Sequence, residues 1–296
     1  MEQERKKRTI AVLGGDGRQR YAAEHLRRMG YSVRTWGLSP EDTLDWRAAL
    51  PADGILLPLP ATADSLSVAT PLCPQLPGLR FSALIDSVKP GSMLFGGRLP
   101  QAWERDARAH GLTVFDYSED EAFQMRNVLP TVEGALLLAL QTLPKTLCGT
   151  TVAVTGYGRI ASLLADRLRA LGAETVVFAR RERDLAAARI RGHRPCRLRS
   201  DAPIRLPQDC RMVFNTVPAP IFGPGSLEQF PRGCVYLELA SLPGGIDLRA
   251  AGGQGIRLLH GGGLPGRCFP ESAGIIVAET VLAHLPTSNG KEGPTC

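Results

Sequence analysis

The stretch at residues 150–161, TTVAVTGYGRIA, decides the fold. Its first half is a β-branched, apolar run that predicts a buried strand, and its second half reads G-x-G-x-x-A. Helical spacing follows over residues 160–171, Gly172 ends that helix, and residues 175–178 predict the next strand. Strand, glycine-rich turn, helix and strand together make a βαβ unit.

The small residues of this turn are those that dinucleotide binding needs. Gly156 permits the tight turn, Gly158 lets the backbone approach a pyrophosphate, and Ala161 allows close packing of the helix. The amino-terminal end of the helix, with Arg159 and Ile160, then faces the anion. We therefore predict a dinucleotide site here, with a merely structural glycine turn as the alternative.

The tip of the second strand of this unit indicates which dinucleotide is bound. An Asp or Glu there accepts a hydrogen bond from the ribose 2′-hydroxyl of NAD, whereas arginine accommodates the 2′-phosphate of NADP. The sequence has Arg180 and Arg181 at this point, and guanidinium groups hold phosphate as forks. NADP is the predicted cofactor, and NAD is the alternative because Glu182 and Asp184 follow closely.

Polar residues also follow a strand predicted at residues 212–214. Asn215, Thr216, Val217 and Pro218 come at the carboxyl end of that strand, where parallel sheets bind their ligands. We expect backbone or side-chain contact with the cofactor, and an ordinary loop is the alternative.

The rest of the chain continues the alternation of strands and helices. Strands are predicted at residues 9–13, 31–36, 54–59, 84–85, 93–95, 112–115, 235–239 and 257–259, and helices at 21–29, 103–110, 134–143 and 272–284. This alternation predicts an α/β protein of two doubly wound parallel-sheet domains with helices on both faces of each sheet.

Three segments make up the expected domain plan. Residues 1–125 form a flavodoxin- or Rossmann-like substrate domain, residues 126–149 form a connecting helix, and residues 150–271 form a Rossmann dinucleotide-binding domain. The arginine-rich segment at residues 189–205 follows no motif.

The composition is that of an ordinary globular protein. The chain has 296 residues, 44% hydrophobic and 22% charged, and its longest apolar stretches fall short of the ~20 residues of a membrane span. The charged N-terminus lacks an apolar signal region, so we expect a cytoplasmic protein.

The seven cysteines of the chain are scattered, which predicts neither disulfides nor a metal site. The net charge of +6 is spread out, with only RKKR at residues 5–8 compact, so no nucleic acid is expected as partner.

Several motifs together resemble one known family. They are GGDGRQ at residues 14–19, NVLPTVEG at 127–134, GYGRIA at 156–161, FNTVP at 214–218, ELAS at 238–241, PGG at 243–245 with Asp247, and LPG at 264–266. In this order, over about residues 9–285, the chain resembles the A subunit of dipicolinate synthase. Ala179-Arg180 matches a strand tip that commonly reads A-R in that family.

The resemblance implies a function and partners. Such a protein belongs to endospore-forming bacteria, acts in the mother cell with the smaller, flavoprotein-like B subunit of dipicolinate synthase, and is an oligomer. It makes dipicolinate, pyridine-2,6-dicarboxylate, from the dicarboxylate heterocycle of the lysine pathway, as hydroxytetrahydrodipicolinate or its dihydro product. The implied architecture is similar to that of 2-hydroxyacid dehydrogenases and adenosylhomocysteinase, with the C-terminal helix, within residues 272–296, returning to the first domain.

The reaction implied by the resemblance needs a hydride acceptor and a base. The nicotinamide takes the hydride and a base takes the proton, and we expect both in the cleft between the domains. Arg18 is expected to pair with a substrate carboxylate, and Asp16 or Glu133 to act as base; alternatively, Asp16 only caps a helix and Glu133 only complements a helix dipole. Asn127 and Thr131 complete the catalytic candidates.

Weaker candidates and rival functions stay open. Arg98 and Arg267 are second-choice partners for a substrate carboxylate. The histidines stand outside the motifs, and His260, beside the glycines at residues 261–263, is the one candidate for proton transfer, with an ordinary loop histidine as the alternative. The rival functions are a stand-alone NADP-dependent 2-hydroxyacid-type dehydrogenase and a non-catalytic cofactor-binding subunit.

Overall fold

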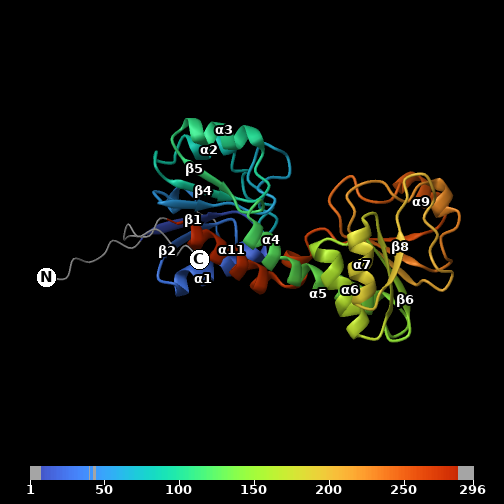
Figure 1. Ribbon diagram of the computed structural model, residues 1–296. Coiled ribbons are helices and arrows are strands. Elements are labelled where there is room, and N and C mark those ends of the chain that lie inside the picture. The colour runs from blue at the N-terminus through green and yellow to red at the C-terminus, as the bar shows by residue number, and fades with distance from the viewer. Residues whose placement is uncertain (1–7, 40, 43–44, 286–296) are drawn as a thin grey trace. The chain divides into compact units, whose positions relative to one another are not determined.

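The computed structural model describes residues 8–39, 41–42 and 45–285. Most of the basic run at residues 5–8 and the polar tail at 286–296 lie outside the described residues. The chain divides into two compact units, Met1–Asn127 together with Phe269–Cys296, and Val128–Cys268 (Figure 1).

The first unit is built on a five-stranded parallel sheet of order β2-β1-β3-β4-β5. Its strands are β1 Thr9–Leu13, β2 Ser32–Trp36, β3 Gly54–Leu56, β4 Met93–Gly96 and β5 Thr113–Asp116. Its helices are α1 Gly17–Arg28, the 3-10 helix η1 Trp46–Ala49, α2 Phe81–Ile85, α3 Gln101–Ala109, α4 Glu121–Arg126 and α11 Pro270–His284.

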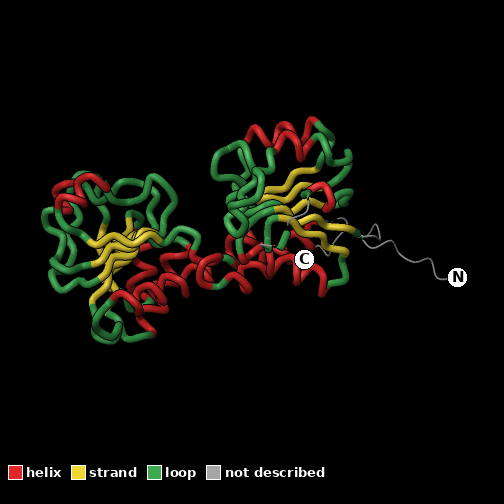
Figure 2. The backbone as a smooth tube through the Cα atoms, turned by 180° about the vertical axis from the view of Figure 1, so that it is seen from behind, coloured by secondary structure: helices red, strands yellow, loops and turns green. Residues whose placement is uncertain are grey.

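Alternate residues of β1 face two different cores. Ile10 and Val12 pack into the core that includes residues of α1 and α11, while Ala11 and Leu13 pack into the core that includes Trp103 of α3. Figure 2 shows the helices on both sides of the strands within this unit. Burial on both faces explains why β1 reads as one apolar run.

The C-terminal helix α11 packs against α1 at very close range. A Cβ added at Gly274 would lie 2.4 Å from the carbonyl oxygen of Arg18 and 3.0 Å from the backbone nitrogen of Ala22. Glycine is therefore the residue that lets these two helix backbones approach. The predicted return of the last helix to the first domain is confirmed.

The second unit is built on a six-stranded parallel sheet of order β11-β10-β9-β6-β7-β8. Its strands are β6 Thr151–Thr155, β7 Glu174–Ala179, β8 Arg194–Arg197, β9 Met212–Asn215, β10 Val235–Glu238 and β11 Arg257–His260. Its helices are α5 Val128–Thr142, α6 Arg159–Ala170, α7 Glu182–Ile190, α8 Pro224–Leu227, α9 Leu248–Gly253 and α10 Leu264–Cys268.

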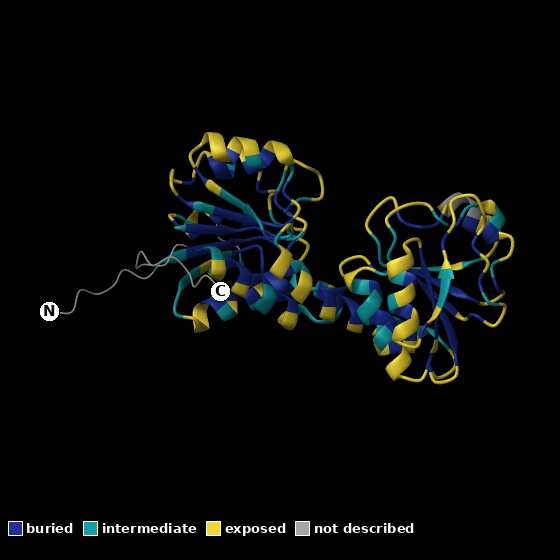
Figure 3. Cartoon of the chain, viewed as in Figure 1, coloured by how far each residue is buried: buried dark blue, intermediate teal, exposed yellow. Residues whose placement is uncertain are grey.

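The strand order of this sheet reverses beside β6. In a doubly wound sheet, ligands bind at the carboxyl ends of the strands where the order reverses. The strand register brings three such ends together, because Thr155 pairs with Asn215 and Asn215 pairs with Glu238. Strands β6, β9 and β10 are largely buried (Figure 3), and Thr155 and Asn215 are fully buried, so a ligand reaches this edge of the sheet through the partly exposed loops that follow these ends.

The predicted fold class, two doubly wound parallel sheets with the second of Rossmann type, is confirmed. One predicted strand is wrong: Leu84 and Ile85 end helix α2, because Phe81, Leu84 and Ile85 bury one helical face. The helix expected to connect the domains at residues 126–149 is α5, which packs within the second unit. The arginine-rich segment at residues 189–205 contains the edge strand β8.

Candidate functional site

The glycine-rich turn joins β6 to α6 as the sequence predicts. Gly156 has φ +89°, and a Cβ there would lie 2.5 Å from Thr216 Oγ1. Only glycine adopts that conformation readily and leaves that space. Ala161 is fully buried among residues of α6 and its neighbours, so the helix starts close to the sheet.

The residues of the turn fit a bound pyrophosphate. Gly158 is the N-cap of α6, it is exposed, and no side chain caps the first turn of this helix. A Cβ added at Gly158 would meet nothing within 4 Å, so the backbone faces open space. Uncapped N–H groups at a helix amino terminus, next to open space, are the arrangement that binds an anionic group. Arg159 and Ile160 begin the helix at this point, and Arg159 is exposed.

The loop after β9 is held in place by the buried side chain of Asn215. Asn215 Oδ1 accepts from Thr155 Oγ1 at 2.5 Å and from the Val217 backbone nitrogen at 3.1 Å. Its Nδ2 donates to Val217 O at 3.0 Å and to Glu238 Oε1 at 2.6 Å. The Asn215 side chain is therefore occupied within the protein, and its role is to order the loop that carries Thr216, Val217 and Pro218.

Glu238 is a site residue for which the sequence motifs indicate no role. Its carboxylate accepts from Asn215 Nδ2, from the backbone nitrogens of Ala240 at 3.0 Å and Gly245 at 2.8 Å, and from the Tyr236 hydroxyl at 3.0 Å. Burial, and then the charge of Glu238, raise the pKa of Tyr236, so the phenol stays protonated and donates. Glu238 thereby fixes the loop after β10 to the end of β9. Its position at the carboxyl end of a predicted strand is the sequence feature that could identify it as a site residue.

Arg180 and Arg181 follow the tip of β7, and both are exposed. Within the described part of the chain, neither guanidinium group has an ion-pair partner. Beside Arg180 lies a cavity of about 580 Å³, also lined by Leu198, Arg199, Ile204, Ala219 and Ile221. The cavity has the size of a small-molecule site and lies at the strand tip where NAD and NADP differ.

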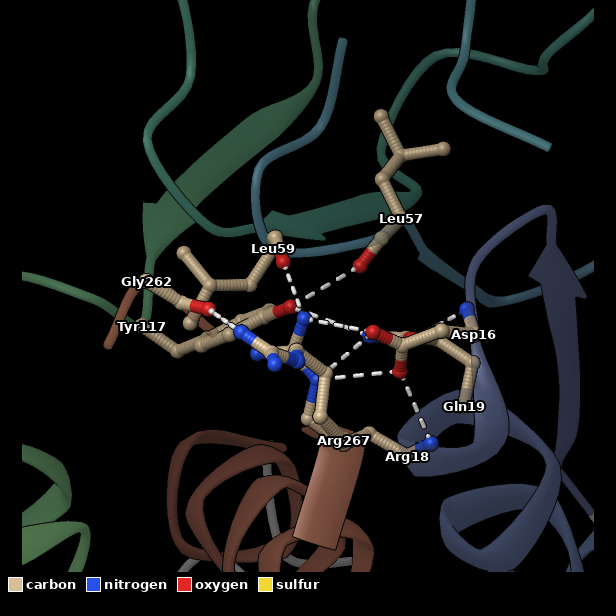
Figure 4. A network of polar contacts seen from close by, with 8 residues as sticks. All are labelled: Asp16, Arg18, Gln19, Leu57, Leu59, Tyr117, Gly262 and Arg267. Atoms are coloured by element: carbon tan, nitrogen blue, oxygen red, sulfur yellow. Dashed lines mark hydrogen bonds and ion pairs between the residues drawn. The ribbon is translucent and has the colours of Figure 1, made fainter. Parts of the chain in front are cut away.

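In the first unit, Asp16 and Arg18 are bound to each other (Figure 4). Asp16 caps α1 and forms a capping box with Gln19, while Arg18 donates from Nε at 2.9 Å and from Nη2 at 2.7 Å to the Asp16 carboxylate. Arg18 Nη2 also donates to the carbonyl oxygen of Leu59. Burial lowers the pKa of Arg18, but the hydrogen bond and charge of Asp16 outweigh it and raise that pKa.

Tyr117 completes the same cluster. Its hydroxyl donates to the carbonyl oxygen of Leu57 at 3.1 Å, and Gln19 Nε2 lies 3.5 Å from it (Figure 4). Burial raises the pKa of Tyr117, so it remains a neutral donor. The cluster keeps Asp16 and Arg18 rigid and leaves Arg18 largely committed to protein partners.

Arg98 stands in contrast to Arg18. It follows β4 with φ +53°, a conformation that is uncommon for any residue but glycine. Asp116 and Ser118 hold it there, since the Arg98 backbone nitrogen donates to Asp116 Oδ1 at 3.2 Å and to Ser118 Oγ at 3.0 Å. The exposed Arg98 guanidinium has no ion-pair partner among the described residues, so a fixed backbone presents an available cation at a strand's carboxyl end.

The remaining catalytic candidates lie where α4 ends and α5 begins. Asn127 caps the end of α4 and is half-buried, Thr131 is buried in α5, and Glu133 is exposed on α5. They fall on both sides of the boundary between the two units.

The two weaker candidates of the second unit have different surroundings. Arg267 Nη1 donates to the carbonyl oxygen of His260 at 3.1 Å. It also donates to the carbonyl oxygen of Gly262 at 3.2 Å (Figure 4), so Arg267 holds the loop after β11 in place. His260 is exposed at the end of β11 and borders a small cavity of about 60 Å³ with Glu238.

A larger cavity of the second unit lies away from this site. It measures about 900 Å³ and is lined by Arg211, Val235 and Arg257, at the amino-terminal ends of β9, β10 and β11. The glycine turn and Arg180 are at the opposite ends of the strands, so this cavity does not coincide with the candidate dinucleotide site. No helix in the described residues is long and apolar enough to span a bilayer. Nor do the residues described by the structure include three or more His, Cys, Asp or Glu grouped to hold a metal ion.

Comparisons with known proteins agree on one family. The family model for the N-terminal domain of the dipicolinate synthase A subunit matches residues 9–118. The A subunit of dipicolinate synthase from Bacillus subtilis (strain 168) is 30% identical over 293 residues, covering 96% of this chain and 98% of the relative. The crystal structure of the corresponding dipicolinate synthase subunit from Bacillus halodurans has a TM-score of 0.79 at 26% identity, covering 94% of this chain and 98% of that one.

A more distant structure shows the fold alone. The apo-structure of D-lactate dehydrogenase from Escherichia coli has a TM-score of 0.57 at 14% identity, covering 93% of this chain and 95% of that one.

Proposed function

The chain belongs to the family of dipicolinate synthase A subunits, and on that premise we propose that it oxidises a partly reduced ring dicarboxylate to dipicolinate with NADP and a B subunit. Dihydrodipicolinate and NADP⁺ then give dipicolinate, NADPH and a proton; a hydroxytetrahydro precursor first loses water. The observation that carries the proposal is the open, uncapped turn at Gly158. We place the reaction in the mother cell of a sporulating bacterium.

The chain's own residues have three tasks in this reaction. The nicotinamide, when bound, accepts the hydride. The first turn of α6 holds the pyrophosphate, and Arg180 and Arg181 hold the 2′-phosphate. Asn215 and Glu238 keep the loops at the carboxyl ends of β9 and β10 in place, next to the turn that would hold the cofactor. Glu133, an exposed carboxylate, is the proposed proton acceptor, with Asn127 and Thr131 as substrate contacts.

Substrate carboxylates are proposed to bind Arg98 rather than Arg18. Asp16 and the Leu59 carbonyl already occupy Nε and Nη2 of Arg18, whereas the Arg98 guanidinium is exposed on a fixed backbone. Asp16 and Arg18 then serve as a rigid charged pair next to the glycine-rich loop that begins at Gly14.

Replacing Arg98 with alanine should raise KM for the ring dicarboxylate about 10- to 100-fold, because a charge-assisted hydrogen bond is lost. Steady-state kinetics with the B subunit present measures it, and kcat should change far less. Arg105→Ala, which removes an exposed arginine from α3, is the matched control and should leave KM unchanged. An unchanged KM in the Arg98 variant would remove this residue from the substrate site.

Replacing Arg180 with aspartate should weaken NADPH binding by at least about tenfold and spare NADH, because the 2′-phosphate loses a cation and meets an anion. Fluorescence titration of the purified chain with each dinucleotide measures both affinities. An equal loss for both dinucleotides, or equal affinities in the unaltered chain, would contradict the assignment of NADP.

One assay separates the proposed function from its rivals. The purified chain is incubated with NADP⁺ and dihydro- or hydroxytetrahydrodipicolinate, with and without the B subunit, and both NADPH and dipicolinate are measured. Formation of both products that requires the B subunit supports the proposal. Reduction of simple keto acids with NADPH by this chain alone would point to a 2-hydroxyacid-type dehydrogenase, and NADPH binding without any turnover would point to a non-catalytic, cofactor-binding protein.

A further inference from the structure

The arginine-rich segment that no motif explained places one side chain beside the proposed 2′-phosphate site. Arg197 ends β8, and the register of the parallel pair sets it beside Ala179, the last residue of β7. Its Nη1 donates to the carbonyl oxygen of Arg180 at 3.3 Å, and its Nη2 forms an ion pair with Glu182 Oε2. Arg197 therefore contacts the residues on either side of Arg181, namely the backbone of Arg180 and the side chain of Glu182.

Glu182 brings a negative charge close to the proposed 2′-phosphate site. It is the first residue of α7 and comes directly after Arg181. A carboxylate at this position is suited to the ribose hydroxyl of NAD and repels the doubly charged phosphate of NADP. The ion pair with Arg197 offsets the charge of Glu182 and holds its Oε2 against a residue of β8.

Stability does not account for this ion pair. The side chains of Arg197 and Glu182 are 50% and 73% exposed, and ion pairs with that much exposure add little to folding. The fold also needs no carboxylate there, since Asp184 supplies a second acidic residue to the first turn of α7.

We propose that Arg197 sets the preference for NADP over NAD by holding the Glu182 carboxylate away from the 2′-phosphate. Arg197 is thus a positioning residue that acts through Glu182, and Arg180 and Arg181 contact the phosphate. This inference rests on the proposed use of NADP.

The test is a double-mutant cycle on dinucleotide binding. Dissociation constants for NADPH and NADH are measured by fluorescence titration for the unaltered chain, Arg197→Ala, Glu182→Gln and the double variant. In Arg197→Ala, NADPH binding should weaken about three- to tenfold, and NADH binding should stay unchanged or tighten. Glu182→Gln in the same chain should restore NADPH binding, because the repelling charge is gone.

The matched control is Arg194→Ala, which removes an exposed arginine from the other end of β8 and should change neither constant. Raising the salt concentration should shrink the effect of Arg197→Ala, because the pair is exposed. Equal losses for NADPH and NADH, or a double variant that binds NADPH as weakly as Arg197→Ala, would overturn the inference.

The dinucleotide preference of the unaltered chain distinguishes failure of the role proposed for Arg197 from failure of the proposed cofactor. If it prefers NADPH and Arg197→Ala keeps that preference, only the role of Arg197 fails. If it shows no preference for NADPH, the proposed cofactor fails, and this inference fails with it.

Discussion

Replacing Gly156 with alanine is expected to weaken dinucleotide binding at least about 100-fold. The new Cβ would lie 2.5 Å from Thr216 Oγ1, and the φ of +89° disfavours any residue with a side chain. The turn must shift to relieve both, and a loss of about 2.8 kcal/mol in binding corresponds to that factor. Isothermal titration with NADPH and NADH measures it, and both affinities should fall together because the pyrophosphate is common to both.

Gly149→Ala is the matched control for this prediction. Gly149 also has a positive φ, +71°, but a Cβ there meets nothing within 4 Å. It therefore imposes similar backbone strain outside the turn and should leave both affinities within about twofold of the unaltered chain. Unchanged binding in the Gly156 variant would mean that the turn holds no pyrophosphate, and the proposed oxidoreductase function would fall with it.

Replacing Gly274 with alanine is expected to lower the free energy of unfolding of the first unit by about 2–4 kcal/mol. Alanine favours a helix over glycine, so an uncrowded site would gain about 1 kcal/mol. Here the added Cβ would meet backbone atoms, 2.4 Å from Arg18 O and 3.0 Å from Ala22 N, which cannot turn aside as a side chain can. The collision outweighs helix propensity and pushes α11 away from α1.

Urea denaturation followed by circular dichroism measures this loss. Ser272→Ala, an exposed substitution in the same helix, is the control and should change stability by no more than about 0.5 kcal/mol. A Gly274 variant as stable as the parent would show that α1 and α11 do not pack as closely as described. Dinucleotide affinity should change little, since the glycine turn belongs to the other unit.

Local signals explain what the sequence could predict. The βαβ unit around Gly156 is predictable because a buried strand, a glycine turn and a helical period follow one another without a gap. The sequence does not predict the edge strand β8, because its residues, RPCR, are mostly polar and include Pro195. An edge strand pairs on one side only, so neither burial nor alternation marks it clearly.

In the candidate site, too, the residues next to a local motif are predictable from the sequence, and the contacts between distant residues are not. Arg180 is identifiable because it follows a predictable strand tip. The pairing of Arg18 is not, since the Leu59 carbonyl comes from 41 residues away in the chain. Likewise, Asp116 holds the Arg98 backbone from 18 residues away, and Glu182 meets Arg197 only because β8 lies beside β7. These pairings depend on tertiary structure, which spacing along the chain does not reveal.

The return of α11 to the first unit has a consequence for the order of events on the ribosome. Val277 and Val281 complete the core on one face of the first sheet, yet they follow the whole of the second unit in the chain and are synthesised after it. The second unit is continuous in sequence, from Val128 to Cys268, and can close its core while the nascent chain is still growing. The first unit, whose translation begins before that of the second, therefore finishes folding last. One apolar face of its sheet stays uncovered until α11 has been synthesised.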